Sequence, residues 1–194
     1  MGARGVRKIE SLDDLIPAFR EAKEASISGK LILESFMEGP ELSLDALVHE
    51  DDIHITGVAD RIIERAPYFV EIGHTLPSAL PADQQAGAVA VFKQAIIALG
   101  IDIGAAKGDI KITPDGPKIV EIAARLSGGW MSAYTYPLST GVNLYKAAIQ
   151  IALGEEPGDL TAKTSLVAVE RSLLPTPGKI LSIRGVEEAR KIKG

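Results

Sequence analysis

Apolar and polar residues alternate along several stretches of the chain, and this period of two predicts half-buried β-strands. The alternation is clearest in ELSLDALVHE (41–50), where one face would carry Leu42, Leu44, Ala46 and Val48 and the other Glu41, Ser43 and Asp45. Composition predicts a buried strand over KLILESF (30–36), and further strands are expected over 53–61, 164–172 and 178–183.

Other stretches carry the start and stop signals of helices. Ser11 followed by Asp13 and Asp14 indicates a helix start, because acidic side chains favour the positive end of the helix dipole. Gly100 and Gly154 are typical helix ends. The predicted helices span 11–26, 82–100, 142–153 and 186–193, with loops over 66–81, which holds three prolines, and 126–140.

The order of these elements predicts the fold class. Strands joined by short turns pair antiparallel, so the chain is expected to be α+β, with mainly antiparallel sheets and packed helices, and not a doubly wound parallel sheet.

The stretch KGDIKITPDGPKIVEIAAR (107–125) predicts a β-hairpin with two acidic residues on one face. With a three-residue turn over 114–116, Thr113 pairs with Pro117 and Asp109 lies directly opposite Glu121. The charged face would then carry Lys107, Asp109, Lys111, Glu121, Ala123 and Arg125, and the core face Ile110, Ile112, Val120 and Ile122.

Two carboxylates that face each other on a sheet repel, so a cation is expected over this pair. The candidates are a divalent metal ion or the side chains of Lys107, Lys111 and Arg125. A Mg²⁺ site that a nucleotide phosphate completes would use Asp109 and Glu121 as ligands, with Arg125 near an anionic substrate. A solvated face on which lysines and carboxylates neutralise one another is the alternative.

Composition narrows the chemistry. There are no cysteines and only three histidines, so a metal would be held by oxygen, which favours Mg²⁺, Mn²⁺ or Ca²⁺. A net charge of −5 with scattered basic residues argues against nucleic-acid binding. No apolar run approaches the roughly 20 residues of a membrane span. The N-terminus has no apolar signal core, so a cytoplasmic location is the default expectation.

Two further segments could bind a nucleotide. In LESFMEGPELSLD (33–45), Glu34 and Glu41 flank the apolar pair Phe36 and Met37, which could form the rim of a purine pocket. A hairpin with two surface glutamates is the alternative. In GARGV (2–6), glycines around Arg4 could present amides to phosphate, and a frayed chain end is the alternative.

Together, these three segments resemble the ATP-grasp superfamily, in particular its ATP-dependent carboxylate–amine ligases. The resemblance spans roughly residues 2–155. It implies that the loop of Gly2, Arg4 and Gly5 covers the triphosphate of ATP, and that Asp109 and Glu121 bind Mg²⁺ or Mn²⁺. The remaining cofactor-binding residues that it implies are Glu34, Ser35, Phe36 and Met37 at the adenine, Glu41 at the ribose, and Lys107 where many members have His.

The resemblance also implies a substrate site. Arg125 matches the catalytic arginine that handles the carboxylate or its acyl phosphate, and Glu71 and His74 match a segment that approaches the substrates. A lone histidine is more often a local hydrogen-bonding residue. The loop SGGW (127–130) could position substrate near Arg125 or be a plain connection. Ala123 departs from the pattern, since many members have a metal-binding Asn there, which puts a second metal ion in doubt.

The expected domains are residues 1–37, part of a small ATP-grasp subdomain that ends in the hinge; 38–157, the large subdomain with the metal hairpin; and 158–194, the start of a C-terminal lobe. Since the family's phosphate-binding lysines precede the glycine-rich loop, the chain is interpreted as a fragment that an upstream domain or partner chain completes. Assembly of the chain into a homo-oligomer is left open by the sequence.

The resemblance implies a ligase that activates a carboxylate as an acyl phosphate for attack by an amine. Its partners would be small-molecule carboxylates and amines, as in amino-acid ligases, carbamoyl-phosphate-synthase-like enzymes or purine-pathway ligases. The alternatives are a nucleotide-binding or structural module without catalysis of its own, and a non-nucleotide binding module with a mixed-charge face.

Overall fold

The computed structural model describes residues 3–50 and 52–192 and is built on a six-stranded sheet. The strand order is β5-β4-β1-β2-β3-β6, and every neighbouring pair is antiparallel. The strands are β1 (Glu41–His49), β2 (Asp52–Glu64), β3 (Val70–Leu76), β4 (Gly104–Thr113), β5 (Gly116–Ala123) and β6 (Ala168–Arg171). The predicted α+β class with antiparallel pairing is therefore confirmed.

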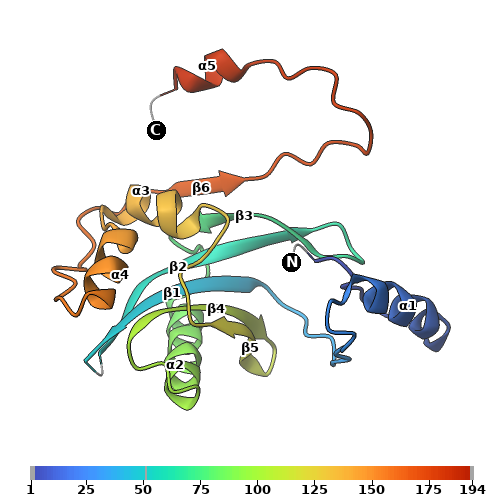
Figure 1. Cartoon of the computed structure of the whole chain (residues 1–194), viewed down its shortest axis with the longest axis horizontal. Helices are drawn as coiled ribbons and strands as arrows, with labels where there is room; N and C mark the ends of the chain where they lie inside the picture. Colours follow the sequence, from blue (N-terminus) through green and yellow to red (C-terminus); the bar gives the residue numbers. More distant parts are fainter. Residues whose placement is uncertain (1–2, 51, 193–194) are drawn as a thin grey trace.

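Helices cover both faces of this sheet (Figure 1). The helices are α1 (Leu15–Ala25), α2 (Ala82–Ala98), α3 (Tyr136–Thr140), α4 (Leu144–Ala152) and α5 (Val186–Arg190), with a 3₁₀ turn at Leu12–Asp14 and a π-helical turn at Met131–Thr135. Within the described residues, none of the helices is long and apolar enough to cross a membrane.

Strand β1 is buried on both faces, which makes it the centre of the molecule. On one face, Leu42, Leu44 and Val48 pack with Phe92 and Ile96 of α2. On the other face, a second apolar cluster holds Leu47, Leu76, Tyr136, Leu144 and Ile151. The polar residues Glu41, Ser43 and Asp45 of β1 are buried on the same face as this second cluster.

The predicted helices are present with small changes at their ends. Pro17 does not interrupt α1, because it is the third residue of the helix, where a backbone N–H has no partner within the helix. Two of the expected loops are wrong in part. Strand β3 lies within the expected loop 66–81, because the three prolines of that stretch lie outside the strand. Helix α3 lies within the expected loop 126–140, because Pro137 is in the first turn of the helix, where proline is tolerated.

Two predicted strands are wrong. Residues 30–36 and 178–183 have no regular structure, and side chains such as Ile32 and Leu181 are exposed. No strand in the described part of the chain pairs with either segment, and without a neighbouring strand a β-conformation leaves its backbone groups unpaired. In Figure 1 the residues after β6 leave the sheet and run above it to α5.

The β4–β5 hairpin places Asp109 directly opposite Glu121, as predicted, but not through the predicted turn. Thr113 pairs with Gly116, so the turn has two residues, and a β-bulge at Val120 then shifts the register by one. Val120 is exposed, which corrects its assignment to the core face, and Ile119 packs against the core in its place.

Candidate functional site

A row of four charged residues and one histidine crosses five strands on one face of the sheet. Directly paired Cα positions run from Lys111 on β4 to Glu41 on β1, Arg61 on β2, His74 on β3 and Glu170 on β6. Because paired residues point to the same side of a sheet, this register gathers side chains that are far apart in the sequence. Positive and negative groups alternate along the row from Lys111 to Arg61.

Arg61 is the centre of this network. Its guanidinium contacts Glu41, its Nη1 lies 3.2 Å from Asp109 Oδ2, and its Nε donates to Glu71 Oε2 at 2.7 Å. Burial disfavours the charged form of Arg61, but the surrounding carboxylates, Asp109 foremost, outweigh this and raise the pKa of the guanidinium. Glu41 is buried with both carboxylate oxygens paired, one to Arg61 and the other to Lys111 Nζ at 3.1 Å.

Lys107, one of the cations predicted as candidates, lies over the hairpin pair. Its ammonium group contacts Asp109 Oδ2 and lies 3.8 Å from Glu121 Oε1, so both carboxylates share one positive charge. Ser43 Oγ donates to the other oxygen of Asp109 at 2.7 Å. Asp109 is buried and Glu121 is 56% exposed, so the pair opens toward solvent on the side of Glu121. Arg125 Nη2 lies 3.7 Å from Glu121 Oε1.

The donor set of this pair fits a hard divalent cation. Asp109 and Glu121 converge on a single ammonium group, and a divalent ion bound by carboxylate oxygens is the usual arrangement for Mg²⁺ or Mn²⁺. Ala123, opposite Lys107 in the register, has no side-chain oxygen to add. Two carboxylates plus oxygens from a nucleotide or water therefore make up the set that this hairpin can offer.

A pocket of about 400 Å³ lies beside the charged face, where the predicted hinge meets the sheet. Phe36 and Met37 of the hinge and Glu41, Arg61 and Lys111 of the sheet are among its lining residues. Phe36 also packs against Phe69, with ring centroids 5.5 Å apart, and Lys8 Nζ lies 4.5 Å above the Phe36 ring. Glu34 and Ser35, which precede them, are exposed and do not line this pocket.

The predicted glycine-rich loop lies beside α1. The backbone turns at Ala3 and Gly5, which both have positive φ, and Val6 N–H donates to Ala3 O at 3.1 Å. Gly5 packs closely on α1, because a Cβ there would lie 2.8 Å from Ala25 Cβ. Arg4 belongs to this turn, and Gly2 lies outside the described residues.

Glu71 and His74 lie on the same face as the hairpin carboxylates. A β-bulge at Ile72 brings them together, since residues three apart in a regular strand would face opposite sides. His74 is buried, with Nδ1 3.3 Å from Glu170 Oε2 and Nε2 3.9 Å from Glu71 Oε1. A Cβ on Gly129 would lie within 3.5 Å of an oxygen of both Glu71 and Glu170, so the 127–130 loop covers this group.

Arg125, the predicted catalytic arginine, lies at the end of the hairpin, where its side chain is 53% exposed. Its Nη1 donates to Leu126 O at 3.1 Å. The structure therefore places Arg125 beside Glu121 and at the start of the loop that covers Glu71.

Three residues of this face were not predicted as site residues from the sequence: Arg61, Glu170 and Asp45, of which only Asp45 was expected on the polar face of its strand. The hairpin turn at 49–52 would place Asp60 opposite Glu41, but a bulge after Asp45 places Arg61 there. Gly57 pairs with Asp45 and lies next to Thr56, the unpaired residue of the bulge. A glycine inside a strand pattern often indicates a bulge, so Gly57 was a signal that could have located it. Glu170 had no local signal.

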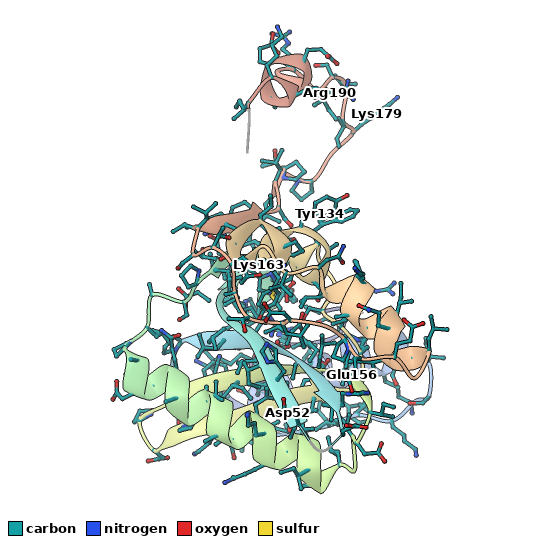
Figure 2. The ribbon with its side chains drawn as sticks, turned by 90° about the vertical axis from the view of Figure 1, so that its left-hand side faces the viewer. Asp52, Tyr134, Glu156, Lys163, Lys179 and Arg190 are labelled. Atoms are coloured by element: carbon teal, nitrogen blue, oxygen red, sulfur yellow. The ribbon has the colours of Figure 1, made fainter. Side chains whose placement is uncertain are left out.

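A second group of potential ligands lies at the far end of β1 from Glu41. The ligand atoms of His49, Glu50 and Glu156 lie within 4.8 Å of one another, in the wall of a pocket of about 380 Å³. Figure 2 labels Glu156 and Asp52, which both line this pocket. None of the residues predicted for ATP or Mg²⁺ belongs to it.

Comparison with known proteins supports the sequence resemblance. The family model described as the ATP-grasp domain matches residues 1–134. Carnosine synthase 1 of Gallus gallus is 34% identical over 131 residues, which cover 66% of this chain and 14% of that protein. The large chain of carbamoyl phosphate synthase from Thermoanaerobacter is 21% identical over 170 residues, 86% of this chain and 15% of that protein.

A solved structure of an L-amino acid ligase from Bacillus licheniformis superposes with a TM-score of 0.73 at 26% identity, covering 81% of this chain and 41% of that one. The chain thus spans between 14% and 40% of the length of the curated relatives that it matches. The family match covers residues 1–134, which is more than half of the chain, and includes strands β1 to β5. The chain therefore belongs to the ATP-grasp family.

Proposed function

We propose that this chain is the ATP- and Mg²⁺-binding portion of a ligase that joins a carboxylate to an amine. The observation that carries the proposal is that Asp109 and Glu121 both approach the ammonium group of Lys107, next to a pocket lined by the predicted hinge. The likeness to an L-amino acid ligase and to carnosine synthase supports a ligase with amino-acid-like substrates.

ATP is proposed to bind with its base near Phe36 and Met37 and its phosphates toward Arg61 and Lys111 in the same pocket. A volume of about 400 Å³ suits a nucleotide-sized ligand. Glu41 would accept from the ribose hydroxyls, with Glu34 and the backbone of Ser35 at the adenine. The loop of Ala3 to Gly5 would close over the phosphates.

The charges of the site suggest how ATP and a metal ion would enter. Four carboxylates, Glu41, Glu71, Asp109 and Glu121, are paired with Arg61, Lys107, Lys111 and Arg125. A triphosphate would attract these cations, which frees oxygens of Asp109 and Glu121 for Mg²⁺. Bound there, Mg²⁺ would neutralise charge on the phosphate oxygens.

The proposed reaction has two steps. An oxygen of the substrate carboxylate bonds to the γ-phosphorus of ATP, the bond from that phosphorus to the bridging oxygen breaks, and ADP leaves. The amine nitrogen then bonds to the carbonyl carbon of the acyl phosphate, phosphate leaves, and the nitrogen loses a proton. Arg125 would neutralise charge on the carboxylate or acyl phosphate, and Lys107 and Arg61 charge on the phosphates.

Glu71, His74 and Glu170 are proposed to receive the amine. Two carboxylates on either side of a histidine make an anionic site under the Gly129 loop, which would attract an ammonium group. An ammonium nitrogen must lose one proton before it can bond to the carbonyl carbon, and it loses a second as the amide forms. His74, held between the two carboxylates, would accept the first of these protons.

The experiment is calorimetric titration of Mg·ATP into this chain and into Glu121→Ala, followed by a phosphate-release assay with mixed amino acids. Loss of affinity by tenfold or more, about 1.4 kcal/mol, is expected in Glu121→Ala. Glu187→Ala is the matched control, since Glu187 is an exposed glutamate paired with Arg190 on α5. Unchanged affinity in Glu121→Ala would overturn the proposed metal site, and binding without turnover would favour a nucleotide-binding module.

A further inference from the structure

Asp45 is a fully buried carboxylate at the centre of the sheet. It lies on β1 opposite Lys107 on β4, on the same face as Ser43 and Asp109. Ser127 Oγ donates to its Oδ1 at 2.5 Å, and Ser132 Oγ donates to its Oδ2. Both oxygens are therefore bound by hydroxyls from one distant segment.

Only part of that segment, residues 127–132, is fixed by packing: Met131 is buried in the second apolar cluster, whereas residues 128–130 are exposed. It connects the metal hairpin to the π-helical turn, and Trp130 within it is 65% exposed with a positive φ. Trp130 packs edge-on against Tyr134, whose ring centroid is 5.4 Å away and which Figure 2 labels near the molecular surface. The carboxylate of Asp45 thus joins a buried strand to serines on both sides of the exposed residues 128–130.

The backbone around Asp45 is also bound to the continuation of this segment. Asp45 N–H donates to the Tyr136 hydroxyl at 3.3 Å, and that hydroxyl donates to Gly57 O. Thr56 Oγ1 donates to Asp45 O at 3.0 Å. The bulge between β1 and β2 lies at this point, so the residues of the bulge contact both Asp45 and Tyr136.

The position of the loop affects the proposed amine site. Gly129 lies against carboxylate oxygens of Glu71 and Glu170, and Arg125 precedes the loop. A shift of the loop would therefore move the cover of that site without moving the hinge pocket, to which the loop contributes no lining residue.

We propose that Asp45 is a positioning residue that holds residues 127–132 over Glu71 and Glu170 and thereby sets the affinity for the amine substrate. The anchoring is independent of the proposed reaction, whereas its effect on substrate affinity rests on the proposed function.

Hydrogen exchange of backbone amides tests the anchoring without any assay of activity. Three amides report on the segment: Met131 N–H donates to Gly128 O, and those of Tyr134 and Thr135 donate to Trp130 O. In Asp45→Ala these amides should exchange about tenfold faster or more, because the hydrogen bonds that hold Ser127 and Ser132 are lost. Trp130, the single tryptophan of the chain, should show faster local motion in fluorescence anisotropy.

Asp60→Ala is the matched control. Asp60 is also a carboxylate on the sheet that accepts from a serine, Ser78, and it holds the loop at Ala79. Its replacement should speed exchange near Ala79 and leave the Met131 to Thr135 amides unchanged. If Asp45→Ala does not fold, Ser127→Ala with Ser132→Ala removes the same hydrogen bonds from the side of the loop.

Unchanged exchange of the three amides in a folded variant of either kind overturns the anchoring. If the anchoring holds, Asp45→Asn should raise KM for the amine severalfold while the affinity for Mg·ATP stays constant. Equal losses in both affinities would show a general structural role and overturn the assignment of Asp45 to the amine site. Absence of any turnover, with faster exchange, would contradict the proposed function and leave the anchoring intact.

Discussion

Arg61 on β2 reaches across β1 to place its Nη1 3.2 Å from Oδ2 of Asp109 on β4. This contact joins the proposed nucleotide pocket, which Arg61 lines, to the proposed metal site, to which Asp109 belongs. A single guanidinium therefore balances charge in both parts of the site.

Arg61→Gln should destabilise the protein strongly. Glu41 and Asp109 are both buried, and removal of a buried ion-pair partner costs about 3 kcal/mol or more because a charge is left uncompensated. Urea unfolding monitored by circular dichroism measures this loss. Arg190→Gln is the control, because its pair with Glu187 is exposed and should contribute less than about 0.5 kcal/mol. Equal stability of the two variants would contradict the network described for Arg61.

Lys107→Met should bind Mn²⁺ more tightly than the wild type in the absence of nucleotide. The Lys107 ammonium contacts both Asp109 and Glu121, so it competes with a cation for their oxygens. Removal of one nearby positive charge should raise the affinity by a factor of about ten. Electron paramagnetic resonance of free Mn²⁺ measures it, with Lys118→Met as the control, since Lys118 pairs with the exposed Asp115. An affinity that does not change would argue against a metal ion between these carboxylates.

Stability should depend on pH through Asp45. Burial raises the pKa of the Asp45 carboxyl, and the hydrogen bonds from Ser127 and Ser132 offset this only in part. Because the folded protein holds the proton more tightly, this contribution to stability is fully present below the unfolded pKa of about 3.9 and is lost as the pH rises through the folded value.

The test compares the wild type with Asp45→Asn, which does not titrate. The unfolding free energy of the wild type minus that of the variant should fall as the pH rises from about 3.9 toward the raised pKa. Denaturant titrations at a series of pH values give this difference. A difference that increases with pH would mean that the carboxylate is stabilised in the folded state, against the prediction.

Gly57→Ala should destabilise the sheet. A Cβ at Gly57 would lie 2.1 Å from Cε1 of the buried Tyr136 ring, so the ring or the strand has to move. Such overpacking costs about 1–3 kcal/mol. Gly178→Ala is the control, since a Cβ there meets no atom closer than 4.0 Å. Thermal unfolding of the two variants measures the difference, and a lowered melting temperature is expected only for Gly57→Ala.

The sequence predicted most elements of this fold because their signals are local. The alternation in 41–50 and the turn at 114–116 indicated strands, and Gly100 indicated a helix end. The segment 30–36 was misassigned because its composition suits a strand while no described strand lies beside it. Which strands pair depends on the whole fold, so the sequence of a single segment does not show whether it has a neighbouring strand.

The site could be predicted only in part because β-bulges decide which side chains meet. The prediction placed Asp109 opposite Glu121 with a three-residue turn. The turn has two residues, and the extra residue of the bulge at Val120 restores the same pairing. A second bulge brings Arg61 to Glu41, and a third brings Glu71 to the side of His74. Each bulge moves side chains to the other face, so charges far apart in the sequence could not be matched without coordinates.

The central claim is that Asp109 and Glu121 hold one divalent ion against the phosphates of ATP. The direct measurement is the affinity for ATP, with and without Mg²⁺, of the wild type, Asp109→Asn, Glu121→Gln and the double variant. If both residues bind the same ion, Mg²⁺ should strengthen ATP binding only in the wild type, and the double variant should lose no more than either single one. Equal strengthening by Mg²⁺ in all four proteins would contradict the claim.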